Sequence, residues 1–302
     1  MTALALLGPT ASGKSALALA LADCRPEVEI VTVDAMQVYR GMDIGTAKAT
    51  VDQQLAVPHH LIDLVDPHED YAVQRWQRDA REAVAAIEAR GHRALLVGGT
   101  GLYLRSIVDD LDIPGQYPLI RRELESEPDT VQLHARLVTL DPTAAARMEP
   151  TNRRRIVRAL EVSVGASRPF SSFGPGLTSY AVPAIRQVGL RVPREVLDTN
   201  IAVRYTAQLE AGFVDEVAAL LARGDGWSST ARQALGYKEL ADHLLGQCSL
   251  DEAVALAAQR TRRFARRQQR WFARDPRVVW LDVAENSMEV LAMLLGEWDQ
   301  CD

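Results

Sequence analysis

The stretch GPTASGKS at residues 8–15 constrains the fold of this chain most strongly, because it matches the pattern G-x-x-x-x-G-K-[ST]. An apolar run at 3–8, which predicts a buried strand, precedes it, and a helical run begins at Lys14. Glycines in such a turn let consecutive backbone N–H groups point at anionic oxygens, and the following helix adds its positive N-terminal end. With the Lys14 ammonium and a Ser15 hydroxyl that can hold Mg²⁺, the pattern predicts a phosphate-binding loop rather than a helix that only happens to begin with glycines.

Strand-like and helix-like runs alternate over most of the chain. Besides 3–8, the predicted buried strands are 29–33, 93–99, 186–192 and 278–283. The predicted helices are 14–22, 71–91, one that starts near 102, 194–224, 233–246, 249–275 and a last one that ends near 298. This alternation predicts an α/β fold with a parallel sheet wound by right-handed crossovers and wrapped by helices.

The middle of the chain departs from this alternation. Residues 111–184 contain no buried strand pattern but several short helical pieces, and they end in a return rich in Ser, Gly and Pro at 167–183. We therefore predict a helical insertion domain at 111–184, with a flexible return, inside a catalytic core formed by 1–110 and 185–302.

Composition limits the class of protein. The chain has 302 residues, of which 47% are hydrophobic, so it can bury a sizeable core and wholesale disorder is excluded. The three cysteines lie far apart without zinc spacing, and no segment has 18 consecutive apolar residues. The N-terminus enters the first strand directly. We expect an untargeted cytoplasmic protein without a membrane span. The adjacent His59 and His60 point in different directions and predict no metal site.

Two further loops are predicted at the carboxyl edge of the sheet, where open α/β sheets bind ligands. Asp34 follows the strand 29–33 and would face the phosphate loop if that strand neighbours the first one. Its carboxylate can hold Mg²⁺, act as a general base, or simply cap a turn. Thr100 lies in the glycine turn after strand 93–99, which is either a tight turn or a contact for substrate.

Arginines cluster although the net charge is −6. Residues 260–274 contain seven arginines and no acid. On the predicted helix, positions 254, 257, 261, 264, 268 and 271 form a mostly apolar face suited to packing. A second stripe about 100° away contains Arg260, Arg263, Arg267, Arg270 and Arg274. Solvated faces usually mix signs, so this stripe favours a polyanion as partner. A second cluster at 153–158 lies in the insertion.

Seven segments in this order resemble the tRNA dimethylallyltransferase (tRNA isopentenyltransferase) family, and together they span nearly the whole chain. They are GPTASGKS, VDAMQVYRGMDIGTAK, PHHLID, LLVGGTGLYL, RRIVRALEV, QALGYKEL and RRFARRQQRWFARD. The resemblance is to the bacterial type, because no cysteine/histidine finger follows the last helix.

The resemblance implies transfer of a dimethylallyl group from dimethylallyl diphosphate to N6 of adenosine 37 of tRNA, next to the anticodon, assisted by Mg²⁺. It also implies a P-loop, nucleotide-kinase-like core whose helical insertion grips the anticodon stem-loop. Nothing in the sequence demands more than a monomer.

The family's functional residues carry over onto matching positions of this chain. The donor diphosphate would bind to Gly8, Pro9, Thr10, Ala11, Ser12, Gly13, Lys14 and Ser15. Thr10 would lie where the two substrates meet, Asp34 would be the general base, and Arg204 would bind the departing pyrophosphate. The residues implied in tRNA contact are Asp34, Ala35, Met36, Gln37, Thr100, Arg121, Arg154, Arg155, Ile156, Val157 and Arg158. To these the polyanion stripe adds Arg260, Arg263 and Arg267.

The sequence departs from the family pattern in places. Many members have an arginine where Asn200 stands, and Arg266 precedes Arg267 and Gln268 where the family often has A-K-R-Q. Two other classes of protein therefore stay open. One is a nucleotide or metabolite kinase that uses the loop on ATP with Asp34 on Mg²⁺, and the other is a non-catalytic RNA-binding NTPase.

Overall fold

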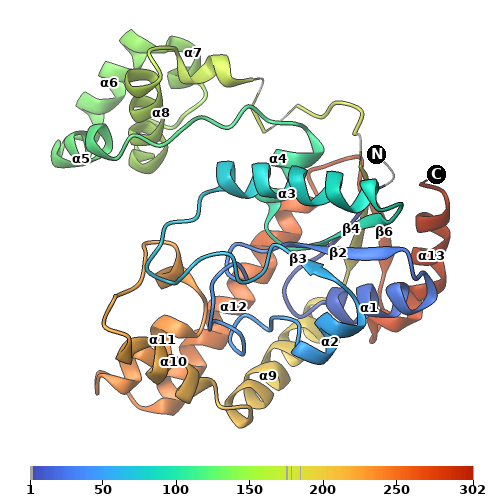
Figure 1. Ribbon diagram of the computed structural model, residues 1–302. Coiled ribbons are helices and arrows are strands. Elements are labelled where there is room, and N and C mark those ends of the chain that lie inside the picture. The colour runs from blue at the N-terminus through green and yellow to red at the C-terminus, as the bar shows by residue number, and fades with distance from the viewer. Residues whose placement is uncertain (1–2, 175, 178, 184, 302) are drawn as a thin grey trace. The chain divides into compact units, whose positions relative to one another are not determined.

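The computed structural model describes residues 3–174, 176–177, 179–183 and 185–301 (Figure 1). The chain divides into two compact units. The core unit is Met1–Val108 with Val182–Asp302, and the insertion unit is Asp109–Ala181. The insertion predicted from the sequence, 111–184, and this compact unit differ by a few residues at each end.

A single parallel sheet forms the centre of the core unit. Among the described residues it has six strands in the order β3-β2-β4-β1-β5-β6. The strands are β1 (Leu4–Leu7), β2 (Val28–Val33), β3 (His59–His60), β4 (Arg93–Gly98), β5 (Arg186–Arg191) and β6 (Val279–Asp282). All the pairings are parallel. The predicted α/β class is therefore confirmed, whereas the short edge strand β3 has no counterpart in the prediction.

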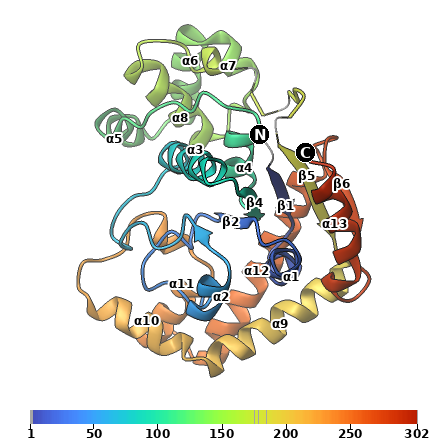
Figure 2. The same cartoon turned by 45° about the vertical axis from the view of Figure 1, so that its right-hand side comes forward.

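The two faces of the sheet bury different sets of side chains, because successive residues of a strand point to opposite sides. Leu4 and Leu6 of β1 pack on one face with α1 (Lys14–Cys24) and α13 (Leu291–Asp299). Ala5 and Leu7 pack on the other face with α3 (Val73–Ala89), α4 (Gly101–Val108) and α12 (Leu250–Phe272). Figure 2 shows α1 and α13 side by side. The remaining helices of the core unit are α2 (Val51–Ala56), α9 (Arg194–Glu210), α10 (Phe213–Ala222) and α11 (Tyr237–Leu244).

Two helical predictions need correction. The run 194–224 forms two helices, α9 and α10, because Gly212 between them adopts φ 93°, which a continuing helix cannot accommodate. On α12, the predicted packing face is shifted rather than absent: Ala257, Thr261 and Gln268 are buried as predicted, whereas Val254, Phe264 and Trp271 are half-buried, and of these Val254 and Trp271 pack on the core. The buried side chains of α12 are Ala253, Ala257, Ala258, Thr261, Ala265, Gln268 and Phe272.

The insertion unit has its own small core. Its helices are α5 (Pro118–Ser126), α6 (Thr130–Leu140), α7 (Pro142–Ala146) and α8 (Arg153–Gly165). Leu124, Leu137, Ile156 and Leu160 pack together between these helices. The return that was expected to be flexible contains a 3₁₀ turn, Phe170–Phe173, which is held by Asp141 through hydrogen bonds from Ser171 N and Oγ, both 2.7 Å long. Residues 175 and 178 of the return lie outside the described residues.

Membrane insertion is not indicated by the helices. In the described part of the chain, none of them combines the length and the apolar character that crossing a bilayer requires.

Gly98 provides a test of this architecture. A Cβ atom there would lie 2.1 Å from the carbonyl oxygen of Val33 on the neighbouring strand. Gly98→Ala is expected to lower the free energy of unfolding by about 1–3 kcal/mol, because backbone atoms must separate. Gly296→Ala is the control, because Gly296 lies on the exposed side of helix α13 with nothing within 4 Å of the added atom. It should stabilise by about 1 kcal/mol. Urea denaturation of both variants measures the difference, and equal effects would contradict the close approach.

Candidate active site

Three loops leave the carboxyl edge of the sheet side by side. Gly98 at the end of β4 is in register with Leu7 of β1 and with Val33 of β2. The phosphate loop, Asp34 and the turn at Gly99 therefore start at adjacent positions. Strand β4 lies between β1 and β2, so the condition under which Asp34 was expected to face the phosphate loop is not met as stated. The two are nevertheless close, because Asp34 and Lys14 interact electrostatically.

The phosphate loop connects β1 to α1 with two residues in the left-handed region. Ala11 has φ 62° and Gly13 has φ 81°. The Lys14 ammonium donates a hydrogen bond of 3.1 Å to the carbonyl of Pro9, at the start of the loop. Ser15 is exposed on the first turn of α1, which carries no acidic residue. A helix N-terminus of this kind favours a bound anion.

Thr10 is held from two sides by helices of the core unit. Arg204 Nη1 on α9 donates to its hydroxyl oxygen at 3.1 Å. The backbone N–H of Thr10 donates to Gln268 Oε1 on α12 at 2.9 Å. Gln268 Nε2 in turn donates to Gly99 O at 2.9 Å. One buried amide therefore connects the phosphate loop with the glycine turn. Gln268 was not among the predicted site residues, although it stands at the glutamine of the family's A-K-R-Q motif.

Two further side chains hold the outside of the phosphate loop. Asn200 Nδ2 donates to Ala11 O at 3.1 Å, at a residue whose positive φ is unfavourable for alanine. Ser287 Oγ donates to Gly13 O at 3.2 Å. The loop conformation is thus supported by contacts from distant parts of the chain. Asn200 contacts the loop directly although many family members have an arginine there.

The two carboxylate oxygens of Asp34 differ: one accepts hydrogen bonds from the turn that follows, and the other is free of such bonds to the described residues. Its Oδ1 accepts hydrogen bonds from Met36 N at 2.7 Å and from Gln37 N at 3.4 Å. The interpretation as a turn residue is therefore correct for one oxygen. Oδ2 makes no hydrogen bond with any described residue, and the side chain is half-buried. A carboxylate fixed through one oxygen leaves the other available for a proton.

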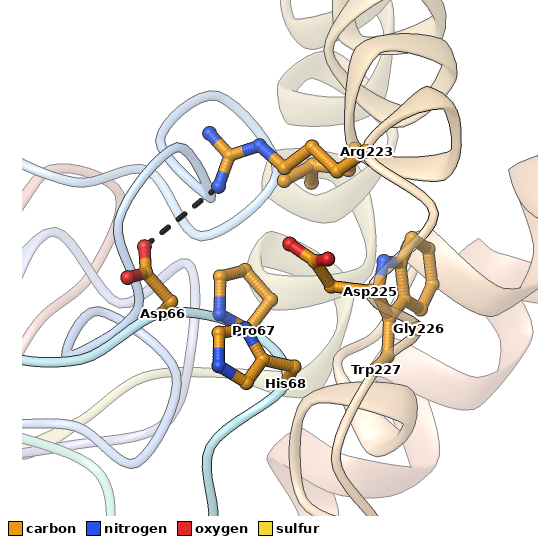
Figure 3. A pocket seen from close by; sticks show the side chains of 8 residues that line it. Asp66, Pro67, His68, Arg223, Asp225, Gly226 and Trp227 are labelled. Atoms are coloured by element: carbon orange, nitrogen blue, oxygen red, sulfur yellow. Dashed lines mark ion pairs between the residues drawn. The ribbon is translucent and has the colours of Figure 1, made fainter.

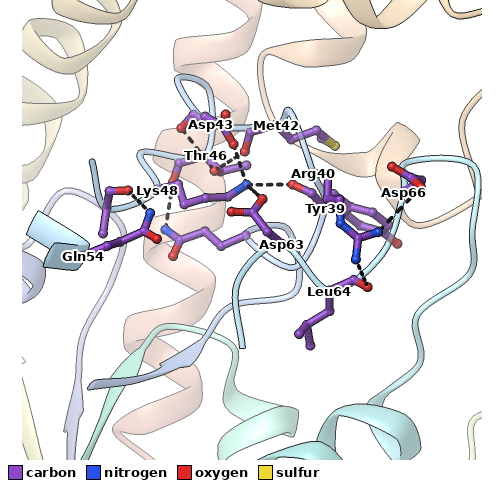
Figure 4. A network of polar contacts seen from close by, with 12 residues as sticks. Tyr39, Arg40, Met42, Asp43, Thr46, Lys48, Gln54, Asp63, Leu64 and Asp66 are labelled. Carbon is purple, nitrogen blue, oxygen red and sulfur yellow. Dashed lines mark hydrogen bonds and ion pairs between the residues drawn. The ribbon is translucent and has the colours of Figure 1, made fainter. Parts of the chain in front are cut away.

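The segment after Asp34 is held by a buried lysine (Figure 4). The Lys48 ammonium contacts Tyr39 O at 2.7 Å and the carboxylates of Asp43 and Asp63 at 2.5 Å each. Gln37, predicted beside the target adenine, donates through its side-chain amide to the carbonyls of residues 46 and 47. Its amide hydrogens therefore serve the loop, and Gln37 can offer only its oxygen or its aliphatic part to a base.

Glu216 of α10 fixes the same loop from the other side. Its carboxylate accepts the backbone N–H groups of Asp43, Ile44 and Gly45 at 2.8–3.2 Å, and the Tyr237 hydroxyl at 2.6 Å. The carbonyl of Gly45 then accepts from Arg204 Nη2 at 3.1 Å. Arg204 is thereby fixed between this loop and Thr10, which sets the direction of its guanidinium group.

Two half-buried cations, Lys14 and Arg204, lie at the phosphate loop. Burial lowers the pKa of Lys14 to about 8, with Asp34 acting to raise it and Arg204 to lower it further. Burial also lowers the pKa of Arg204 below its ordinary value. Both shifts report positive charge that is poorly compensated in a desolvated place. An anionic ligand would restore the balance.

Thr100 begins at the same edge. It is half-buried, and its N–H donates to Val33 O at 3.3 Å. On either side of it, glycines allow α12 to approach. A Cβ atom would lie 2.2 Å from Gln268 Nε2 at Gly99 and 2.1 Å from Trp271 Nε1 at Gly101.

Comparisons with known proteins show the family to which the chain belongs. Residues 37–275 match the family described as IPP transferase. The tRNA dimethylallyltransferase of Kineococcus radiotolerans is 50% identical over 94% of this chain and 91% of that protein. That of Streptomyces coelicolor is 50% identical over 92% and 89%. The chain belongs to the IPP transferase family.

Solved structures of similar proteins extend the match. The tRNA isopentenylpyrophosphate transferase of Bacillus halodurans has 36% identity and a TM-score of 0.70, covering 99% of this chain and 97% of that one. A eukaryotic dimethylallyltransferase acting on tRNA has 24% identity and a TM-score of 0.78, covering 95% and 75%, and supports the fold alone. The resemblance seen in the sequence is therefore confirmed.

Not every arginine of the predicted stripe on α12 is free to bind a polyanion. Arg260 forms an ion pair with the buried carboxylate of Glu239 on α11. The exposed members are Arg263, Arg267, Arg270 and Arg274, and none of these has an acidic partner among the described residues. The pattern on one helix could not reveal the pairing of Arg260, because Glu239 lies on another helix.

Of the residues predicted to contact tRNA in the insertion unit, some are buried or paired with an acid and others are exposed. The side chains of Ile156 and Val157 are buried in its core, so they offer no surface to RNA. Arg121 and Arg158 both pair with the buried carboxylate of Glu161, at 3.5 Å and 3.0 Å. The remaining residues of this group, Arg154 and Arg155, are exposed. Two of the four arginines predicted to contact RNA there are therefore engaged within the unit.

One cavity is lined by residues outside the candidate active site (Figure 3). It has a volume of about 150 Å³ and is lined partly by Asp66, His68 and Trp227, with Arg223 3.8 Å from the Asp66 carboxylate. No predicted site residue lines it. Within the described residues, no group of three or more His, Cys, Asp or Glu side chains could hold a metal.

The lowered pKa of Lys14 predicts that the protein takes up a proton when an anion binds beside this residue. Because its pKa is about 8 in the free protein, an anion that binds beside it should raise this pKa toward the ordinary value and draw in a proton. Binding of inorganic pyrophosphate near pH 8 should therefore take up about half a proton through Lys14, and much less near pH 6. Calorimetry in two buffers of different ionisation enthalpy measures it.

The matched control is Lys14→Arg, whose side chain stays charged throughout this pH range. Comparing the two proteins removes the protonation of pyrophosphate itself. An uptake that is equal in both would contradict the assignment of the shifted group.

Proposed function

We propose that this IPP transferase moves a dimethylallyl group from dimethylallyl diphosphate to N6 of adenosine 37 of tRNA. The products would be N6-(dimethylallyl)adenosine and diphosphate. The observation that carries this proposal is the meeting of an anion-binding loop, the Asp34 carboxylate and the Arg204 guanidinium, both half-buried, at one edge of the sheet. Relatives of 50% identity are named tRNA dimethylallyltransferases.

The loop from Gly8 to Ser15 would bind the diphosphate of the prenyl donor. Lys14 and Arg204 supply positive charge in a desolvated place, where it stabilises a developing anion more strongly than in water. Ser15 offers an exposed hydroxyl on the first turn of α1, and hydroxyl and phosphate oxygens are donors that suit Mg²⁺. When bound there, Mg²⁺ would neutralise part of the charge of the leaving pyrophosphate.

Asp34 would act as the general base. The adenine N6 is a poor nucleophile because its lone pair is delocalised into the ring, and it becomes acidic as it attacks the allylic carbon. Oδ1 is occupied by the turn, so Oδ2 is the oxygen that would accept this proton. Thr10, which Arg204 and Gln268 hold, would lie where the two substrates meet.

The RNA partner would be the anticodon stem-loop of tRNA. The target base must leave its stack to reach a buried edge of a sheet, so we propose that it flips out of the anticodon loop. Thr100 and the segment from Asp34 to Gln37 would surround it. The exposed arginines of α12, with Arg154 and Arg155 of the insertion unit, would contact the RNA backbone. We propose a monomer that acts on cytoplasmic tRNA.

The direct test is incubation with dimethylallyl diphosphate, Mg²⁺ and unmodified tRNA, followed by mass spectrometry of the nucleosides. The expected product is prenylated adenosine at one position. Phosphoryl transfer from ATP without RNA would instead indicate a kinase. Slow ATP hydrolysis that leaves the tRNA unchanged would indicate a non-catalytic RNA-binding NTPase.

Asp34→Asn should separate chemistry from binding. The asparagine oxygen can still accept from Met36 N and keep the turn, but the side chain cannot take up the N6 proton. Single-turnover prenyl transfer should fall by about 10²–10⁴-fold, while the Kd for tRNA stays nearly unchanged. Asp282→Asn on the edge strand β6, an exposed carboxylate, is the matched control. Full activity of the Asp34 variant would remove the base assignment.

The arginines of α12 should control the salt dependence of tRNA binding. Replacing Arg263, Arg267 and Arg270 by Ala should weaken binding, because fewer RNA phosphates are then neutralised by the protein. The slope of log K against log salt should fall by roughly 1 for each such phosphate. Filter binding at several salt concentrations measures this.

The control variant replaces Arg78, Arg191 and Arg194, which are exposed but paired with acids elsewhere on the core unit. It removes the same net charge. An equal change of slope in both triple variants would show that only total charge matters and would exclude the stripe as the contact surface.

A further inference from the structure

Gln268 is the one side chain among the described residues that bonds to both glycine-rich loops at the carboxyl edge. Its Oε1 accepts the Thr10 N–H and its Nε2 donates to the Gly99 carbonyl, both at 2.9 Å. Both partners are backbone groups, and the side chain is buried. The amide therefore has a defined orientation, with its acceptor toward the donor-binding loop and its donor toward the turn that carries Thr100.

We propose that Gln268 is a positioning residue for prenyl transfer, which sets the distance between the phosphate loop and the glycine turn. This rests on the proposed function of the same site. Thr10 is the point through which Gln268 acts, because Arg204 holds its hydroxyl while Gln268 holds its N–H. Losing the amide would free the Thr10 backbone to rotate and would leave Gly99 O without its donor.

A purely structural role for Gln268 would predict a different result. The helix α12 is attached to the core unit independently of this residue. Arg260 pairs with Glu239 on α11, Thr261 Oγ1 lies 2.9 Å from the Tyr205 hydroxyl on α9, and Gln269 Nε2 donates to Val192 O at 3.0 Å. Removing the Gln268 amide should therefore leave the helix in place and change chiefly the alignment of the two loops.

The neighbouring Gln269 provides a matched control. It is on the same helix and also donates a side-chain hydrogen bond to a carbonyl, but it contacts the end of β5 rather than the site. Gln268→Met and Gln269→Met keep the side-chain length and remove the amide. For each variant, three quantities are measured: the single-turnover rate of prenyl transfer, the Kd for tRNA, and the melting temperature.

We expect Gln268→Met to lose about 10- to 100-fold in transfer rate, because a shift of about 1 Å in reacting groups costs this much. Its tRNA affinity and melting temperature should match those of Gln269→Met, which should transfer at nearly the wild-type rate. If both variants transfer equally fast, or if the loss in Gln268→Met follows a loss of folding, the proposal is overturned. Absence of transfer in the wild-type protein would instead reject the proposed function itself.

In Gln268→Glu, the pH dependence of the transfer rate tests the proposal, because a purely structural role would not change it. The introduced carboxylate can accept from Thr10 N–H but cannot donate to Gly99 O, whereas its protonated form can do both. Burial raises the pKa of such a group. The transfer rate relative to wild type at the same pH should therefore rise by about tenfold or more between pH 8.5 and pH 6, and Gln268→Met should show no such recovery. A constant ratio for Gln268→Glu would contradict the proposal.

Discussion

The candidate site depends on the absence of side chains at the carboxyl end of β4. A Cβ atom at Gly98, Gly99 or Gly101 would lie 2.1–2.2 Å from the Val33 carbonyl, the Gln268 amide or the Trp271 indole, respectively. Only glycine lets the neighbouring strand and α12 come this close. The phosphate loop, Asp34 and α12 can therefore meet at this edge, and the hydrogen bonds that Gln268 makes to two loops follow from that approach.

The loop after Asp34 is rigid for a different reason. Its buried Lys48 faces two carboxylates, and the half-buried Glu216 of α10 accepts hydrogen bonds from three of its backbone N–H groups and from the Tyr237 hydroxyl. Buried charges of this kind are costly unless paired, and once paired they hold one geometry. The result is a fixed platform on which Gly45 O orients Arg204. The site thus obtains its geometry from paired charges outside it.

Much of this could be predicted from local sequence, and the rest could not for identifiable reasons. The strands other than β3, and the phosphate loop, follow from short apolar runs and one motif, which act within a few residues. Strand order depends on crossovers, so the placement of β4 between β1 and β2 was not foreseen. Gln268 and Glu216 are single polar residues in helices, and Arg260 is neutralised by a partner on another helix. Such contacts become visible only when segments far apart in sequence are placed together.

The charge balance around the phosphate loop explains why its motif alone does not identify the ligand. Lys14 and Arg204 are two half-buried cations, and the neighbouring carboxylate that acts on both is Asp34. The free site thus carries excess positive charge, which any diphosphate group could neutralise. Under the proposed function, a prenyl donor would differ from a nucleotide in the use made of Asp34. A carboxylate with one oxygen fixed by a turn and the other unengaged is better suited to accepting a proton than to completing a metal shell.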